Sequence, residues 1–296
     1  MDTFLRNGKS FQGSSFHLYL DKINYLLHLF RMPTKYIIHN YLNLEEQSNF
    51  KFKKKLLQNI SNSGTKFGGF SLKKYLTQKI NSFVASDKGS RIFTTDQSKN
   101  IQEIVENSLD KAMNILENNN TVQVYLVPTL NKFLKEYMDG IQGFCASRNA
   151  IHLYIHPDCN LKTGLVETLV HEYNHTVFYV HHTWKTVEEG LIAEGLAEHF
   201  RSEIVGGKRA KWTEVFDEKE STLWLEKIRP TLNSEAGQDY YNVFVNFDEE
   251  PYPLWTGYTI GYYLIERFRK QNKLNWQELM QVKPNEVLDS IKIVTN

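Results

Sequence analysis

The pentapeptide His171-Glu-Tyr-Asn-His175, of the form HExxH, constrains this chain more than any other feature. On a helix, positions i and i+4 lie on one face, so both imidazoles can reach one metal ion while Glu172 faces a water beside it. A catalytic zinc site takes three protein ligands and keeps a fourth position open. Glu194 follows His175 after eighteen intervening residues, 176–193, and can supply the third ligand. The spacing predicts a site for one zinc ion.

The segments that carry these residues have the periodicity of helices. In the segment 165–180, apolar side chains form a stripe on a different side from the two histidines. The segment 187–205 predicts a second helix, and Gly206 follows it where a left-handed residue is favoured. Glu198 lies one turn after Glu194 and can accept a hydrogen bond from a ligand histidine, which would fix its tautomer. The alternative is two helices joined by salt bridges at their surfaces.

His181 is a second candidate for the third ligand, because its offset from His175 matches the longer pattern HExxHxxGxxH. In that pattern the glycine breaks the helix. Here Phe178 stands in its place, so the helix continues and turns His181 away from the face of His175. We expect His181 and His182 to be exposed at the helix end.

Five stretches of the chain together carry a resemblance to a known family: Val122–Pro128, Asn149–His156, HEYNH, EGLAEHF and Trp255–Tyr263. In order and spacing they resemble the YjaZ-like family of predicted zinc-dependent proteases, over roughly residues 96–290. The chain is also similar to the wider gluzincin group, in which the third ligand is a glutamate from a second helix. Asn174 stands where many relatives have a histidine, which leaves the metal site intact.

This resemblance implies a metallopeptidase fold and a role for each site residue. It implies His171, His175 and Glu194 as metal ligands, Glu172 as the general base, and Glu198 as the acid that orients a ligand histidine. It does not supply the substrate.

The order of the elements predicts an α+β fold of the zincin-like type, with a small sheet, the HExxH helix and then a mostly helical part. A helix capped by one of residues 94–96 comes first. Strands follow at 121–127 and 151–155, the second preceded by a loop at 140–143. We expect residues 96–296 to form the catalytic domain.

We expect the strand 149–155 at the edge of the sheet, above the metal. There it could hold an extended peptide by main-chain hydrogen bonds. An ordinary structural edge is the alternative.

The sequence of residues 1–95 predicts a mainly helical region of unknown role, because it has helical patterns near 18–31 and 71–84. The stretch 47–86 contains several lysines and neither Asp nor Glu, so it could meet an anionic partner. We favour the alternative that this stretch forms a solvated face in contact with acidic patches of the chain itself, because the formal charge of the chain is only +1.

Composition and the absence of long apolar runs predict a cytoplasmic protein. A nearly neutral chain has no bulk attraction to nucleic acid. The two cysteines, Cys145 and Cys159, do not form a disulfide framework. The first residues lack the apolar core of a signal peptide, and no segment is apolar enough for stable insertion in a membrane.

Tyr258 is the candidate donor to the oxyanion of a tetrahedral intermediate, because it lies on a helix predicted over 255–268. Tyr262, one turn later, is the alternative, followed by His199 and the loop of residues 230–239. Either tyrosine could instead pack in the core with a satisfied hydroxyl.

The pattern predicts a zinc metallopeptidase that acts on peptides or proteins. Zinc would polarise the substrate carbonyl and lower the pKa of a water, and Glu172 would take its proton. The alternative is a non-proteolytic zinc protein with a regulatory or partner-binding role. Glu172 argues against a structural site, which is closed by four protein ligands and needs no base.

Overall fold

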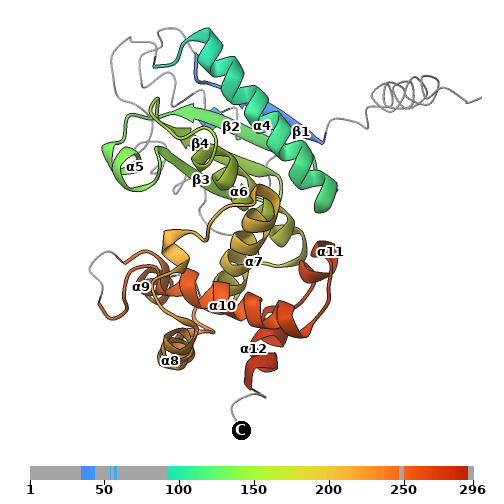
Figure 1. Cartoon of the computed structure of the whole chain (residues 1–296), viewed down its shortest axis with the longest axis vertical. Coiled ribbons are helices and arrows are strands. Elements are labelled where there is room, and N and C mark those ends of the chain that lie inside the picture. The colour runs from blue at the N-terminus through green and yellow to red at the C-terminus, as the bar shows by residue number, and fades with distance from the viewer. Residues whose placement is uncertain are drawn as a thin grey trace, which may run out of the picture. The chain divides into compact units, whose positions relative to one another are not determined.

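The structure is a computed structural model that describes residues 35–43, 54, 57, 58, 92–235, 237–246 and 250–292. The chain divides into two compact units, Met1–Lys35 and Tyr36–Asn296, and the description below concerns the second. Its elements in chain order are β1 (Tyr36–Asn40), α4 (Thr95–Ile115), β2 (Val122–Pro128), α5 (Lys132–Tyr137), β3 (Ile141–Ser147), β4 (Ala150–Ile155), α6 (Gly164–His181), α7 (Val187–Val205), the 3₁₀ turn η1 (Lys211–Thr213), α8 (Glu218–Ile228), η2 (Arg229–Thr231), α9 (Gln238–Phe244), α10 (Thr256–Gln271), α11 (Trp276–Leu279) and α12 (Pro284–Lys292) (Figure 1).

The four strands form one mixed sheet in the order β1-β2-β4-β3. β2 pairs in parallel with β1 and with β4, whereas β3 pairs antiparallel with β4. A small sheet with many helices confirms the predicted α+β class.

The position of β4 corrects the prediction for the sheet edge. Among the strands that the structure describes, β4 lies inside the sheet, and β3 is the edge strand beside the HExxH helix. The sequence indicated only a loop at 140–143. The reason is that β3 reads IQGFCAS, with a glycine inside it and one β-branched residue, so it lacks the usual signal of a strand.

The two faces of the sheet differ, as the two-residue period of a strand requires. Val124 and Leu126 of β2 and Ile151 and Leu153 of β4 join the main hydrophobic core together with residues of α4 and α6. The other face carries ring contacts between Tyr125 of β2 and its neighbours on β1 and β4. Figure 1 shows α4 and α6 against the sheet.

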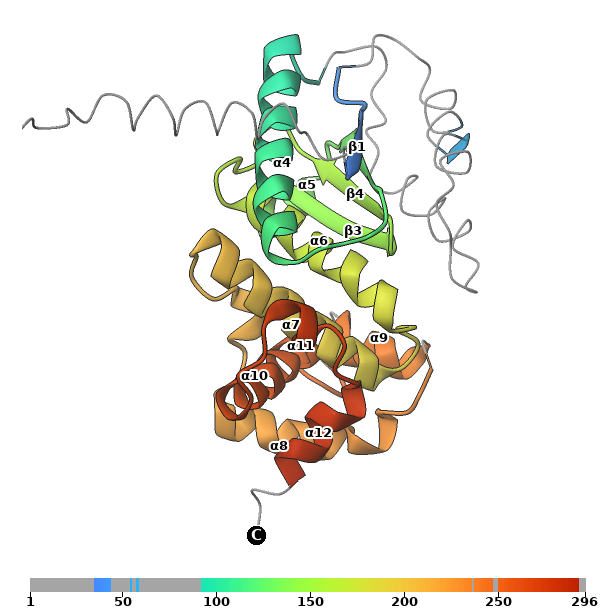
Figure 2. The same ribbon diagram turned by 90° about the vertical axis from the view of Figure 1, so that its right-hand side faces the viewer.

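The helices of the site begin and end where local signals place them. α6 and α7 confirm the helices predicted over 165–180 and 187–205. The hydroxyl of Thr186 and the carboxylate of Glu189 form a capping box at the start of α7, and Gly206 ends it with a φ of 69°. Figure 2 shows α7 between α6 and α10, so α7 is held on both sides.

The compact unit begins at Tyr36, whereas the sequence placed a domain boundary between residues 95 and 96. The difference arises because β1 pairs with β2 and so belongs to the sheet. The predicted helical patterns near 18–31 and 71–84, and almost all of the lysine-rich stretch 47–86, lie outside the described residues.

Among the described residues, no helix combines the length and the apolar character that crossing a membrane requires. The cytoplasmic location stays a prediction.

Candidate metal centre

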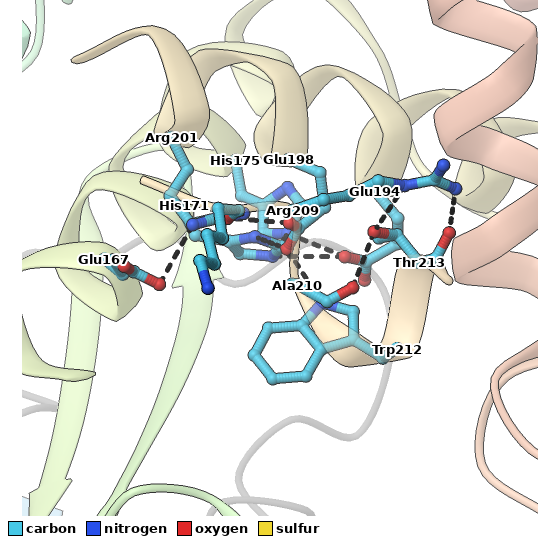
Figure 3. A network of polar contacts seen from close by, with 11 residues as sticks. Glu167, His171, His175, Glu194, Glu198, Arg201, Arg209, Ala210, Trp212 and Thr213 are labelled. Atoms are coloured by element: carbon cyan, nitrogen blue, oxygen red, sulfur yellow. Dashed lines mark hydrogen bonds and ion pairs between the residues drawn. The ribbon is translucent and has the colours of Figure 1, made fainter. Parts of the chain in front are cut away.

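Three side chains from two helices converge on one point. His171 Nε2 lies 2.9 Å from His175 Nε2 and 3.1 Å from Glu194 Oε2, and His175 Nε2 lies 3.4 Å from the same oxygen. Figure 3 shows these side chains pointing toward one another. Within the described part of the chain, this is the group of histidine, cysteine and acidic side chains whose spacing could hold a metal ion.

The sequence produces this convergence by simple means. The two histidines are one helical turn apart on α6, and their ring centroids are 4.6 Å apart. The stripe predicted for this helix is buried on another side, with Leu169, Tyr173 and Val177 in the core. α7 packs on α6 and brings Glu194 to the histidine face.

The donor set fits a zinc ion. Two imidazole nitrogens and one carboxylate oxygen make a three-ligand set typical of catalytic zinc, with a fourth position left for water or substrate. The two Nε2 atoms are 2.9 Å apart, and their lone pairs would repel each other if neither nitrogen carried a proton. This arrangement therefore calls for a cation between the two nitrogens or a proton on one of them. The set is shielded, since Glu194 is only 6% exposed and His175 only 3%.

The electrostatics of the site favour a negative charge on Glu194. Burial opposes ionisation of Glu194, but the neighbouring His175 and His171 outweigh it and lower the pKa of Glu194 to about 2. Burial likewise disfavours the charged form of His171, but its contacts with Glu194 and Glu198 outweigh it and raise the pKa of His171 well above its ordinary value. A carboxylate that stays ionised suits a metal ligand.

Glu198 lies on the far side of His171 from the convergence point. Its Oε1 atom is 2.9 Å from His171 Nδ1, and the carboxylate is 1% exposed. An acceptor at Nδ1 leaves the lone pair of Nε2 directed at the metal position. Glu198 thus contacts His171, and its role in orienting this histidine stays a prediction.

Glu172 lies against the edge strand β3 and is not one of the three residues whose ligand atoms converge. It is 9% exposed, and burial raises its pKa above the ordinary value, although the neighbouring histidines partly oppose this shift. A Cβ atom on Gly143 of β3 would lie 2.6 Å from Glu172 Oε1. The absence of a side chain at Gly143 therefore leaves the room that Glu172 occupies.

His181 does not belong to the converging group. It ends α6 and is exposed, as predicted. His182 differs from the prediction, because it is half-buried and its Nε2 lies 2.9 Å from the carbonyl oxygen of Met280.

Tyr258 and Tyr262, both on α10, have different surroundings. Tyr258 is half-buried, and its pKa is raised well above the ordinary value by burial and then by the charge of Glu194. Tyr262 stacks on His199 with ring centroids 4.2 Å apart, and Cζ of Arg209 lies 3.9 Å from the centroid of the Tyr262 ring. Of these two phenols, Tyr258 is therefore the one whose pKa the charge of Glu194 raises.

Sequence reasoning missed several residues at this site. Trp184, in the turn between α6 and α7, has a φ of 44° and places its ring centroid 4.7 Å from that of His175. Bulky residues rarely adopt such a backbone conformation, and the strain is typical of functional sites. Arg201 and Trp212 contact Glu198 and were also missed. Arg201 follows Glu198 by three residues on α7, so helix spacing could have indicated that contact. No short motif marks Trp184 or Trp212, because their contacts depend on how the turns around α7 fold back.

Comparison with known proteins agrees with this geometry. The family model described as "Predicted Zn-dependent protease (DUF2268)" matches residues 101–289. The chain belongs to the DUF2268 family of predicted Zn-dependent proteases. The match to DUF2268 spans α6, α7 and α10, and so includes every candidate site residue.

A curated relative is also found. "Uncharacterized protein YjfC" of Bacillus subtilis (strain 168) is 25% identical over 162 residues, which cover 50% of this chain and 54% of the relative. The chain therefore spans about half the length of this relative. No solved structure gives a significant match.

Proposed function

We propose that this chain is a zinc-dependent peptidase with a gluzincin-like site on a zincin-like fold. The observation that carries the proposal is the convergence of His171 Nε2, His175 Nε2 and Glu194 Oε2, with Glu172 beside them and free of that set. Membership of a family described as predicted Zn-dependent proteases supports it.

The residues of the site divide the chemistry between them. Zinc held by His171, His175 and Glu194 would supply a Lewis acid that polarises the scissile carbonyl and acidifies a water. Glu172 accepts the proton of the attacking water and delivers it to the leaving amine. The raised pKa of Glu172 lies closer to neutral pH than that of an ordinary glutamate, which suits a group that must both take and give a proton.

Tyr258 completes the proposed mechanism. A phenol with a raised pKa stays protonated at neutral pH, so it can donate a hydrogen bond to the negative oxygen that develops on the carbonyl.

The proposed substrate is a peptide or a protein segment in extended conformation. Within the described part of the sheet, β3 pairs on one side only, with β4. Its Gly143 lies against Glu172. A peptide added along β3 would be bound by main-chain hydrogen bonds and would pass beside the proposed base.

The test is a metal analysis of the purified protein combined with digestion of a proteome-derived peptide library. We expect about one zinc per chain and cleavage that chelators abolish. Glu172→Gln should keep its zinc and fold but lose hydrolysis, because the amide cannot accept the proton.

Three other outcomes count against the proposal. Protein without bound metal, even after incubation with zinc, would overturn the metal centre. Zinc without cleavage would favour the non-proteolytic alternative, and near-normal turnover by Glu172→Gln would overturn the mechanism.

A further inference from the structure

The carboxylate of Glu198 contacts three side chains, of which His171 is only one. Its Oε1 atom accepts a hydrogen bond from Trp212 Nε1 at 2.8 Å and lies 2.9 Å from His171 Nδ1. Its Oε2 atom accepts a hydrogen bond from Arg201 Nε at 3.1 Å. Both oxygens are therefore fixed in direction, and Figure 3 shows this arrangement.

Arg201 is itself fixed by two further contacts. Its Nη1 donates to Glu167 Oε2 at 2.9 Å, and its Nη2 donates to the carbonyl oxygen of Lys208 at 3.1 Å. The guanidinium is 2% exposed. A buried carboxylate next to a buried guanidinium is far less costly than either charge alone. The pair can thus keep Glu198 ionised although it is removed from solvent.

Trp212 is placed by the backbone that follows α7. Gly206 turns the chain in the left-handed region, and η1 then carries the indole back to α7. The Thr259 hydroxyl of α10 donates to the carbonyl oxygen of Trp212 at 3.0 Å. The indole donor is therefore anchored to two helices and does not depend on a flexible surface position.

We propose that Trp212 and Arg201 are positioning residues for the metal centre, which act on the ion through Glu198 and His171. If the carboxylate of Glu198 could rotate, the His171 ring would lose its fixed partner at Nδ1 and its Nε2 would no longer be aimed at the ion. Partners of this kind orient ligands and change metal affinity without touching the metal. The inference rests on the proposed metal site.

The test compares the Trp212→Phe variant with the wild-type protein. Phenylalanine keeps an aromatic ring at position 212 but removes the N–H donor. Trp224→Phe is the matched control, because Trp224 stacks on Phe216 and contacts neither Glu198 nor His171 in the structure. Zinc affinity is measured by competition with a chromophoric chelator, and ligand geometry by the visible spectrum of the cobalt(II)-substituted protein.

We expect Trp212→Phe to bind zinc about tenfold more weakly than the wild type. This is the lower end of the roughly 10- to 100-fold loss that follows removal of a residue bonded to a metal ligand, which is the loss expected of Glu198→Ala. Its cobalt spectrum should differ from that of the wild type, while Trp224→Phe matches the wild type in both measurements. A merely structural tryptophan would change the melting temperature and leave the cobalt spectrum unaltered.

Glu167→Gln tests the positioning role of Arg201, since replacing the buried Arg201 itself risks unfolding the protein. The glutamine keeps an acceptor but loses the charge, so zinc affinity should fall by less than in Trp212→Phe. Wild-type affinity and an unchanged cobalt spectrum in both variants would overturn the positioning role. If the wild-type protein binds neither zinc nor cobalt, the proposed function fails instead, so the two failures are distinguishable.

Discussion

A Cβ atom on Gly195 of α7 would overlap the carbonyl oxygen of Gly261 on α10. The reverse also holds, because a Cβ atom on Gly261 would overlap the carbonyl oxygen of Leu191. The two helix backbones are therefore in direct contact at this crossing. Since Glu194 immediately precedes Gly195, the crossing also sets the position of the proposed third ligand.

Gly195→Ala should force α7 and α10 apart. The neighbouring atoms belong to backbone and cannot move aside as a side chain could, so we expect a loss of about 1–3 kcal/mol or more in the free energy of unfolding. Urea denaturation measures it. Gly237→Ala is the control, since a Cβ there would meet nothing nearer than 3.7 Å. Equal stabilities of the two variants would show that the crossing is not tight.

Gly143→Ala should separate zinc binding from catalysis. The added methyl group would collide with the Glu172 side chain and displace the proposed base, whereas the three ligand atoms lie elsewhere. We expect zinc content to be kept and kcat to fall by roughly 10²-fold, the lower end of what a general base contributes. Gln142→Ala, at the neighbouring strand position, controls for damage to β3. Normal turnover of Gly143→Ala would remove Glu172 from the mechanism.

The parts of the site predicted from the sequence are those governed by local rules. The i, i+4 geometry of His171 and His175 follows from helix periodicity. Glu194 was predicted from its spacing to the HExxH motif, which needs a third zinc ligand. Glu198, one turn after Glu194, again follows from helix periodicity. The apolar stripe in 165–180 predicted α6, and the helical segment 187–205 ended by Gly206 predicted α7.

The remainder depends on contacts between distant segments. β3 has a weak strand signal and exists because it pairs with β4. β1 belongs to the sheet only through its pairing with β2, more than 80 residues away in sequence. Trp212 reaches Glu198 because the chain reverses after Gly206. No residue pattern within any one of these segments specifies its partner.

Replacing Glu194 distinguishes the two candidate third ligands. Glu194→Gln should lose zinc or bind it far more weakly, because a charged oxygen ligand is replaced by a neutral amide. His181→Ala should keep one zinc per chain, since His181 is exposed at the end of α6. Metal content after dialysis measures both. The reverse pattern would move the site to the longer histidine motif.

The stability of the protein should fall in acid partly through His152. This side chain is fully buried, and within the described part of the chain neither ring nitrogen has a hydrogen-bond partner. Burial lowers the pKa of His152 to about 3. Between its ordinary pKa, near 6.5, and about 3, the unfolded chain binds a proton that the folded chain does not, so the free energy of unfolding falls as the pH falls.

His152→Phe should remove this part of the pH dependence. The stability of the variant relative to the wild type should increase as the pH drops from 6.5 toward 3, in urea titrations at several pH values. The exposed His181→Gln variant should follow the wild type much more closely. Parallel curves for His152→Phe and the wild type would mean that His152 does not resist protonation in the fold.

Tyr258→Phe tests the proposed oxyanion donor. The substitution removes one oxygen atom, so packing against Phe244, whose ring centroid is 5.7 Å from that of Tyr258, should survive. If the hydroxyl stabilises the oxyanion, kcat should fall by about 10²-fold with little change in KM, because that hydrogen bond strengthens only in the transition state. Zinc content should be unchanged.

Tyr262→Phe is the matched control for this variant. Tyr262 lies on the same helix but stacks on His199 and under Arg209, so its hydroxyl should not contribute to the rate. A tyrosine with a purely structural role would lower the melting temperature and keep kcat. A drop in kcat confined to Tyr262→Phe would reverse the assignment, and unchanged kcat in both variants would direct the search to His199 or to residues 230–239.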